Sequence, residues 1–216
     1  MKIMNRTFVN GLLLCFCIFL LSSCKDKSKH NQNKAPQQTN IIVFLVDDMG
    51  WQDTSLPFWT STTDLNRTYH TPNMERLADK GMKFTQAYAN AVCSPTRVSL
   101  LTGMNAARHR VTNWTLRKNV SNDAHDELLD FPLWNVNGLQ ACDTIENAIQ
   151  ATTLAQLLQD NGYQTIHVGK AHFGAIGTPG ADPQNLGFKV NIAGHAAGAV
   201  DGGAGEVRHV GADDEG

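Results

Sequence analysis

The stretch from Ile41 to Gly50 reads IIVFLVDDMG and decides the expected fold. Its first six residues form a continuous apolar run rich in β-branched side chains, which is typical of a central strand of a parallel sheet covered on both faces. The run ends abruptly at Asp47 and Asp48. Two adjacent carboxylates after a buried strand offer the oxygen ligands that Ca²⁺ and Mg²⁺ prefer, and a solvated turn is the alternative interpretation.

Further elements alternate along the chain in the manner of a parallel α/β protein. Residues 71–81 (TPNMERLADKG) have a Thr cap, a Pro at the first helical position and a Gly at the end, so we expect a helix there. A strand-like KFTQAYA follows at 83–89. Residues 153–162 read as a second capped helix, and 163–168 (YQTIHV) as a second strand. The pattern predicts an α/β fold with a mostly parallel central sheet flanked by helices.

A third helix is expected within AVCSPTRVSLLTG, which begins at Ala91. Ser94 is a suitable N-cap, Pro95 suits the first helical position, and Gly103 provides the stop. This assignment places Cys93 at a helix N-terminus, where unpaired N–H groups and the helix dipole favour an anion.

Cys93 is followed by Arg97 within about one helical turn, so the guanidinium adds positive charge at the same end. One alternative is that Cys93 is a small buried hydrophobic residue. Another is the loop of cysteine phosphatases, in which a thiolate and an arginine enclose phosphate. That loop has a longer spacing than the four residues found here, and Pro95 lacks an N–H donor, so a thiolate nucleophile is disfavoured.

Polar residues also follow the strand expected at 163–168, where the sequence continues GKAHFG. Open α/β sheets bind ligands at the carboxyl ends of their strands. Lys170 and His172 are two residues apart, so in extended geometry both side chains point to one side. The alternative is a pair of ordinary surface residues.

The composition and the N-terminus bound the class of protein. With 216 residues, 42% hydrophobic content and a net charge of −2, the chain is globular, and no nucleic-acid partner is indicated. Residues 1–24 combine basic residues, a short apolar run and Leu21-Ser22-Ser23-Cys24, which resembles a bacterial lipobox. We therefore expect an exported lipoprotein on a periplasm-facing membrane or the cell envelope, with lipid on Cys24 entering the bilayer. An ordinary secretory signal ending near Ser23 is the alternative.

The segments that flank the folded part are polar or small. Residues 25–39 are expected to be a flexible tether, and residues 199–216 are a Gly/Ala-rich tail with almost no large apolar residue, expected to be disordered or aberrant. Only two cysteines, Cys93 and Cys142, remain within the folded part. This number does not make a disulfide framework, although one bridge between them stays open.

The motifs together resemble one family. Cys93-Ser94-Pro95-Thr96-Arg97 followed by Leu-Leu-Thr-Gly is similar to the signature of type I sulfatases, which share the alkaline phosphatase superfold. The segments NIIVFLVDDMGW, TPNMERLADKGMKFTQAYA and GYQTIHVGKAHFG resemble further family segments in the same order. The resemblance runs from about Asn40 to about Gly198, so residues 40–198 are expected to be the N-terminal portion of a sulfatase catalytic domain.

The resemblance implies a chemistry for the first two motifs. Cys93 would be oxidised to formylglycine by the formylglycine-generating enzyme, and hydration of the aldehyde would give a geminal diol that attacks the sulfur of a sulfate ester. Asp47 and Asp48 would bind Ca²⁺ together with the modified Cys93. Arg97 would hold the diol and support the metal site.

The resemblance also assigns roles near the third motif. Lys170 would bridge the diol and the bound sulfate, and His172 would take a proton from the second hydroxyl so that sulfate is released. His195 lies near the expected substrate-facing region and is a candidate for substrate binding, with a loop or core role as the alternative. By analogy the substrates are sulfated glycans or polysaccharides.

Parts of the family pattern have no counterpart before Gly216. We find no further Asp with Asn or His for the metal and no leaving-group acid, so we expect a truncated enzyme with little or no turnover. One alternative is a phosphatase or phosphodiesterase of the same superfold, although such an enzyme would usually use Ser or Thr where Cys93 stands. The other is a non-catalytic, lipid-anchored protein that binds sulfated glycans.

Overall fold

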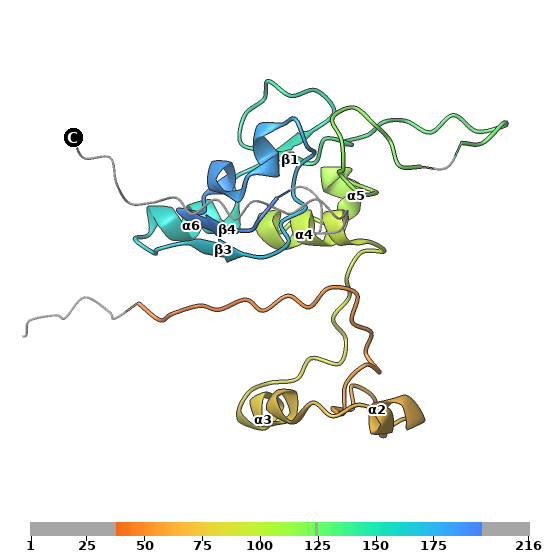
Figure 1. Ribbon diagram of the computed structural model, residues 1–216, viewed down its shortest axis with the longest axis vertical. Coiled ribbons are helices and arrows are strands. Elements are labelled where there is room, and N and C mark those ends of the chain that lie inside the picture. Colours follow the sequence, from red (N-terminus) through yellow and green to blue (C-terminus); the bar gives the residue numbers. More distant parts are fainter. Residues whose placement is uncertain (1–37, 124, 196–216) are drawn as a thin grey trace, which may run out of the picture. The chain divides into compact units, whose positions relative to one another are not determined.

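The computed structural model describes residues 38–123 and 125–195, which are coloured in Figure 1. The chain divides into two compact units, Met1–Leu45 and Val46–Gly216. The expected signal peptide, the lipid on Cys24, most of the tether and the tail at 199–216 lie outside the described residues.

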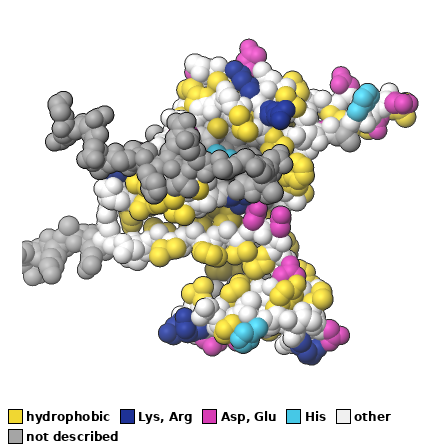
Figure 2. All heavy atoms as spheres, in the orientation of Figure 1, with side chains coloured by type: hydrophobic (Ala, Val, Ile, Leu, Met, Phe, Trp, Pro, Cys, Tyr) yellow, Lys and Arg dark blue, Asp and Glu magenta, His cyan; other side chains and the backbone are white. Residues whose placement is uncertain are grey.

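Two helices follow the Asp47–Asp48 turn. Helix α2 (Asp64–Thr68) starts with a capping box, in which the Thr63 hydroxyl accepts from the Asn66 backbone while the Asn66 side chain accepts from Thr63. Helix α3 (Pro72–Lys80) lies between Thr71 and Gly81, which confirms the expected helix. None of its residues is buried. Figure 2 shows hydrophobic side chains on the surface of the segment that carries these helices.

Helix α4 (Cys93–Thr102) carries the central motif, and its start differs from the expectation. Val92 is the N-cap, so Cys93 is the first helical residue and Pro95 the third. Pro95 is tolerated because the first four N–H groups of a helix have no partner within it. Ser94 does not cap the helix, since its hydroxyl accepts instead from the backbone N–H of Thr115. The helix ends as expected at Gly103, which has a φ of 68°.

The remaining described elements are two parallel strand pairs, two further helices and two 3₁₀ turns. In chain order they are α5 (Ala106–His109), β1 (Leu139–Gln140), β2 (Ile149–Gln150), α6 (Leu154–Asp160), β3 (Ile166–Val168), the 3₁₀ turns η1 (Pro179–Ala181) and η2 (Pro183–Leu186), and β4 (Val190–Ile192). Strand β1 pairs in parallel with β2, and β3 pairs in parallel with β4. The described part of the chain is thus of the expected α/β class, with α6 close to its expected position.

A hydrophobic core joins α4 to the strands. Its buried members are Val98, Leu101, Val111, Leu139, Ala171, Phe173 and Leu186. Each large aliphatic side chain buried in this way contributes about 1.5–3 kcal/mol relative to an exposed one. Because Ala171 belongs to this core and lies between Lys170 and His172, the core fixes the backbone that carries both residues.

Two expected strands are not formed. Within the described residues, 41–46 and 83–89 have no strand pairing, and their apolar side chains are exposed, with Ile42 at 89% and Phe44 at 87%. An extended segment becomes a stable strand only when its backbone groups pair with a neighbouring strand. Among the described residues, β1 pairs with β2 and β3 with β4, so neither run has such a neighbour there. Among the described helices, none is long and apolar enough to cross a membrane.

Candidate active site

The first turn of α4 and the turn after β3 meet at the candidate nucleophile. Cys93 Sγ lies 3.1 Å from Nδ1 of His172, although the two residues are 79 positions apart. The thiol is partly buried and is not in a disulfide. The structure therefore places the first helical residue of α4 in direct contact with an imidazole.

Asp47 connects the end of the apolar run to the other two motifs. Its Oδ1 accepts from Nη2 of Arg97 at 3.0 Å, and its Oδ2 accepts from Nζ of Lys170 at 2.5 Å. Arg97 is buried, and its Nη1 also donates to the backbone carbonyl of Lys170 at 2.6 Å. Partial burial raises the pKa of Asp47, but hydrogen bonds and charge from Lys170 and Arg97 outweigh it, so the pKa is lowered from 3.8. Asp47 is thus an ionised carboxylate held by two cations.

His172 is a neutral imidazole inside the site. It is only 3% exposed, and burial together with the positive charges of Lys170 and Arg97 lowers its pKa to about 4. Its Nε2 is buried and has no hydrogen-bond partner within 38–123 and 125–195. At neutral pH the ring therefore holds a free electron pair and can accept a proton from a group attached at Cys93.

The turn that carries Lys170 and His172 is not extended, contrary to the expected geometry. Gly169 and His172 both have positive φ values, 86° and 52°. A non-glycine residue in this region is strained by about 1–3 kcal/mol and persists only when its surroundings hold it. The backbone N–H of His172 donates to the carbonyl of His195 at 3.1 Å, and this bond is one such restraint. The side chain of His195 is exposed, and its expected role in substrate binding stays a prediction.

The described residues do not gather the expected metal ligands. No group of three or more His, Cys, Asp or Glu side chains within them is arranged to hold a metal ion. Both oxygens of Asp47 are engaged by cations, Asp48 is exposed with a φ of 54°, and Cys93 faces His172. Calcium takes about six to eight oxygen ligands, which two carboxylates do not supply. These residues thus supply only part of the oxygen ligands that a calcium ion takes.

Sequence reasoning missed His167 and Asn191, which lie beneath the site. They are register partners in the β3–β4 pair. The signal that could have revealed them is the alternation along β3, because Ile166 and Val168 are exposed while His167 lies on the opposite face. Cys142, to which we assigned no role, has its Sγ 3.1 Å from Oγ1 of Thr144.

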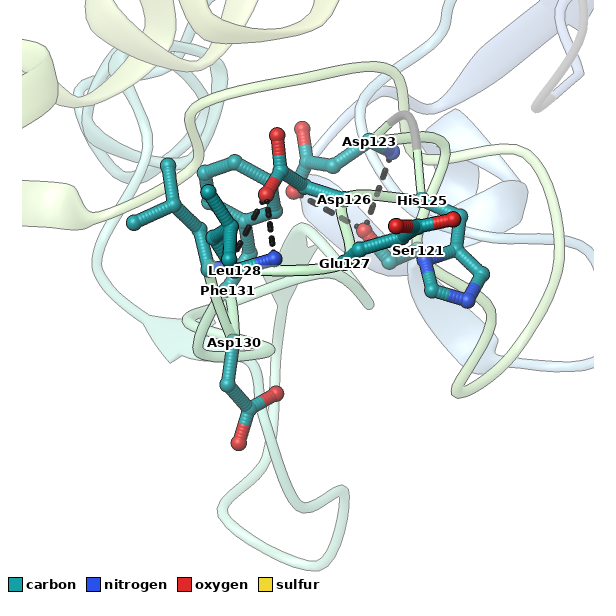
Figure 3. A pocket seen from close by; sticks show the side chains of 9 residues that line it. Ser121, Asp123, His125, Asp126, Glu127, Leu128, Asp130 and Phe131 are labelled. Atoms are coloured by element: carbon teal, nitrogen blue, oxygen red, sulfur yellow. Dashed lines mark hydrogen bonds between the residues drawn. The ribbon is translucent and has the colours of Figure 1, made fainter.

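A hollow elsewhere in unit Val46–Gly216 is acidic and contains none of the candidate catalytic residues (Figure 3). It is lined by Ser121, Asp123, His125, Asp126, Glu127, Leu128, Leu129, Asp130 and Phe131. Two of its carboxylates are engaged locally, since Asp123 accepts from Ser121 and Asp126 accepts from backbone N–H groups. The surplus of negative charge disfavours an anionic sulfate ester.

The parallel strand pairs, the accompanying helices and the site at the N-terminus of α4 define an α/β protein with a candidate nucleophile beside a neutral histidine. Residues 39–201 match the family model described as Sulfatase, and the chain belongs to this family.

Named relatives agree with this assignment. The chain is 35% identical over 154 residues to arylsulfatase G of Mus musculus, covering 71% of this chain and 23% of that protein. It is 31% identical over 166 residues to the N-acetylgalactosamine-6-O-sulfatase of Bacteroides thetaiotaomicron, covering 76% and 26%. A crystal structure of Ps i-CgsB in complex with k-i-k-neocarrahexaose aligns with a TM-score of 0.43 and 26% identity, covering 68% of this chain and 26% of that one. The chain thus spans about a quarter of the length of such relatives.

Proposed function

We propose that this chain forms the nucleophile-bearing part of a sulfuric ester hydrolase that acts on sulfated carbohydrates. The observation that carries the proposal is the 3.1 Å contact between Cys93 Sγ and His172 Nδ1, beside the Asp47–Arg97–Lys170 network. Family membership supports the reaction class.

Cys93 Sγ marks the position at which the oxygens of a converted residue would be attached. Formylglycine at this position would supply a geminal diol, one hydroxyl of which attacks sulfur as the ester alcohol departs, while loss of a proton from the other allows carbon–oxygen cleavage to release sulfate. This chemistry fits the site, because the proton acceptor that it needs lies within hydrogen-bonding distance.

The side chains around Cys93 have complementary roles in this proposal. His172, neutral at neutral pH because its pKa is about 4, takes the proton through Nδ1. Lys170 and Arg97 supply positive charge that stabilises the negative charge on the sulfate oxygens. Lys170 is also held by Asp47, so we expect its ammonium group to be shared between the carboxylate and the bound sulfate.

Calcium and the sulfated sugar are further parts of the proposal. A Ca²⁺ bound at Asp47, Asp48 and the converted Cys93 would offset sulfate charge, and it would need more oxygen ligands than the described residues supply. A sulfated carbohydrate is supported by the name of the N-acetylgalactosamine-6-O-sulfatase relative. The partner that converts Cys93 would be a formylglycine-generating enzyme.

The place of action is proposed from the sequence alone. The Leu21-Ser22-Ser23-Cys24 pattern supports export and a lipid anchor on the outer side of a membrane, where sulfated polysaccharides are accessible.

The test is to trap the covalent intermediate. The chain is co-expressed with a formylglycine-generating enzyme, incubated with an aryl sulfate, and the peptide containing residue 93 is examined by mass spectrometry. We expect sulfate on this peptide, and more of it in His172→Ala, because the proton acceptor for its release is missing. Cys93→Ala is the matched control. Absence of sulfate on residue 93 in both the unmutated chain and His172→Ala would refute the proposed function.

A further inference from the structure

His167 occupies a fixed position beneath the candidate site. Its ring packs edge-on against Phe173, with centroids 5.4 Å apart, and against Phe188, with centroids 5.2 Å apart. The two phenyl rings are nearly parallel to each other. Because the imidazole is enclosed by aromatic rings, it has little freedom to reorient.

His167 lies near two segments that position Lys170 and His172. The Lys170 backbone is close enough to His167 to raise the pKa of its imidazole. The Lys170 carbonyl also accepts from Arg97. On its other side His167 lies against Gly194, where an added Cβ would come within 2.5 Å of His167 Nδ1. The residue after Gly194 supplies the carbonyl that accepts from the backbone N–H of His172.

Folding alone does not explain a histidine at this position. His167 Nδ1 is buried and has no partner of hydrogen-bonding geometry among the residues that the structure describes. Such a group costs about 1–3 kcal/mol, which an apolar ring of similar shape would avoid. Burial also lowers the pKa of His167, against smaller upward contributions from Asn191 and Lys170, so the ring is neutral at neutral pH. It acts as a hydrogen-bonding group and adds no charge.

We propose that His167 is a positioning residue, which holds the Lys170 backbone and the segment at Gly194 so that Lys170 and His172 face a bound sulfate together. The inference rests on the proposed function, because it assigns His167 a purpose in sulfate binding. Misplacement of binding groups by about 1 Å can cost large factors in rate or affinity, so an indirect role of this kind is measurable.

The test compares His167→Phe, which keeps a ring between Phe173 and Phe188, with His167→Gln, which keeps a hydrogen-bond donor. Binding of inorganic sulfate to the full chain is followed by NMR through the signals of Lys170 and His172, and the free energy of unfolding is measured by urea denaturation. We expect sulfate affinity to fall about tenfold in His167→Phe with no loss of stability, and to be largely restored in His167→Gln. His70→Phe, at an exposed histidine, is the control.

The outcomes separate this inference from the proposed function. If the unmutated chain binds sulfate and His167→Phe binds it equally well, the positioning role is refuted while the function stands. If His167→Phe and His167→Gln lose affinity only in proportion to lost stability, the role is structural and the inference also fails. If sulfate does not perturb Lys170 or His172 in the unmutated chain, the proposed function itself is contradicted.

Discussion

The carboxylate of Asp47 is shared between Arg97 and Lys170, and it joins the end of the apolar run to the other two motifs of the site. These partners are 50 and 123 residues away, so no local pattern reveals the pairing. The residue types at the site were predictable from the motifs, but the contacts among them depend on the fold.

The Arg97–Asp47 pair gives a first prediction, about stability. Arg97→Gln removes a buried guanidinium and leaves Asp47 and the Lys170 carbonyl without that donor. We expect the free energy of unfolding to fall by about 1–3 kcal/mol, less than for a fully buried pair because Asp47 is 38% exposed. Urea denaturation measures it. Arg67→Gln is the matched control, since its pair with Asp64 is exposed and contributes at most about 1 kcal/mol. Equal effects of both variants would contradict the account.

The buried histidines give a second prediction, about pH. Burial lowers the pKa of His109, His167 and His172 below 6.5, and that of His172 to about 4. Above pH 6.5 these groups are neutral in both the folded and unfolded chains. As the pH falls below 6.5 the unfolded chain takes up protons that the folded chain does not, so stability falls by up to about 1.4 kcal/mol per pH unit for each histidine.

Denaturant titrations between pH 7.5 and pH 4.5 measure this loss on either side of the histidine pKa of 6.5. His109→Gln should make the free energy of unfolding depend less steeply on pH. The substitution removes a buried imidazole whose Nδ1 accepts from Val111 and whose protonation is disfavoured in the folded chain. His70→Gln, which changes an exposed histidine, is the matched control variant. A stability that is independent of pH across this range would contradict the assigned protonation states.

At the scale of elements, caps and glycines predicted helices better than apolar runs predicted strands. The ends of α3 and α4 at Gly81 and Gly103 were found correctly, since helix termination is local chemistry. The cap of α4 was assigned wrongly to Ser94, because Ser94 bonds across the chain to Thr115. Strands at 41–46 and 83–89 were expected from composition alone, which says nothing about the neighbour that a strand requires.

A third prediction concerns the end of α4. Gly103 has a φ of 68°, and no atom lies within 4 Å of the place that a Cβ would occupy, so a substitution there meets only backbone strain. Gly103→Ala should cost about 1 kcal/mol, and Gly103→Asn less, because Asn tolerates the left-handed region better. Thermal unfolding of the two variants measures this difference. If both variants lose the same stability, the left-handed backbone conformation at Gly103 does not determine the effect of substitution there.

At the scale of the whole molecule, family membership was predictable because four short motifs occur in the family's order, and residues 39–201 match its model. The order of the motifs does not by itself predict the contact between Cys93 and His172. That contact forms because the fold brings α4 against the turn after β3. The calcium site expected at Asp47 and Asp48 stays a prediction, because the described residues supply too few oxygen ligands to complete it. The chain spans about a quarter of its relatives' length.

A fourth prediction concerns when Cys93 is converted. Pro95 and Arg97 follow Cys93 in the motif, and we expect the converting enzyme to recognise them. Both are buried in α4. The folded chain should therefore be a poor substrate for a formylglycine-generating enzyme, while a synthetic peptide of residues 88–105 should be converted. Aldehyde yield, measured with a hydrazide label, compares the two, and the urea-unfolded chain is the control. Equal conversion of the folded chain would contradict the burial of the motif.

The mass of the peptide containing residue 93 tests whether Cys93 is the precursor of an aldehyde nucleophile beside His172. The chain is produced in cells that contain a formylglycine-generating enzyme, digested, and analysed with and without an aldehyde-selective label. The account predicts an aldehyde at position 93 and none in Cys93→Ala. An unmodified thiol throughout, in cells that convert a known sulfatase expressed beside it, would contradict it.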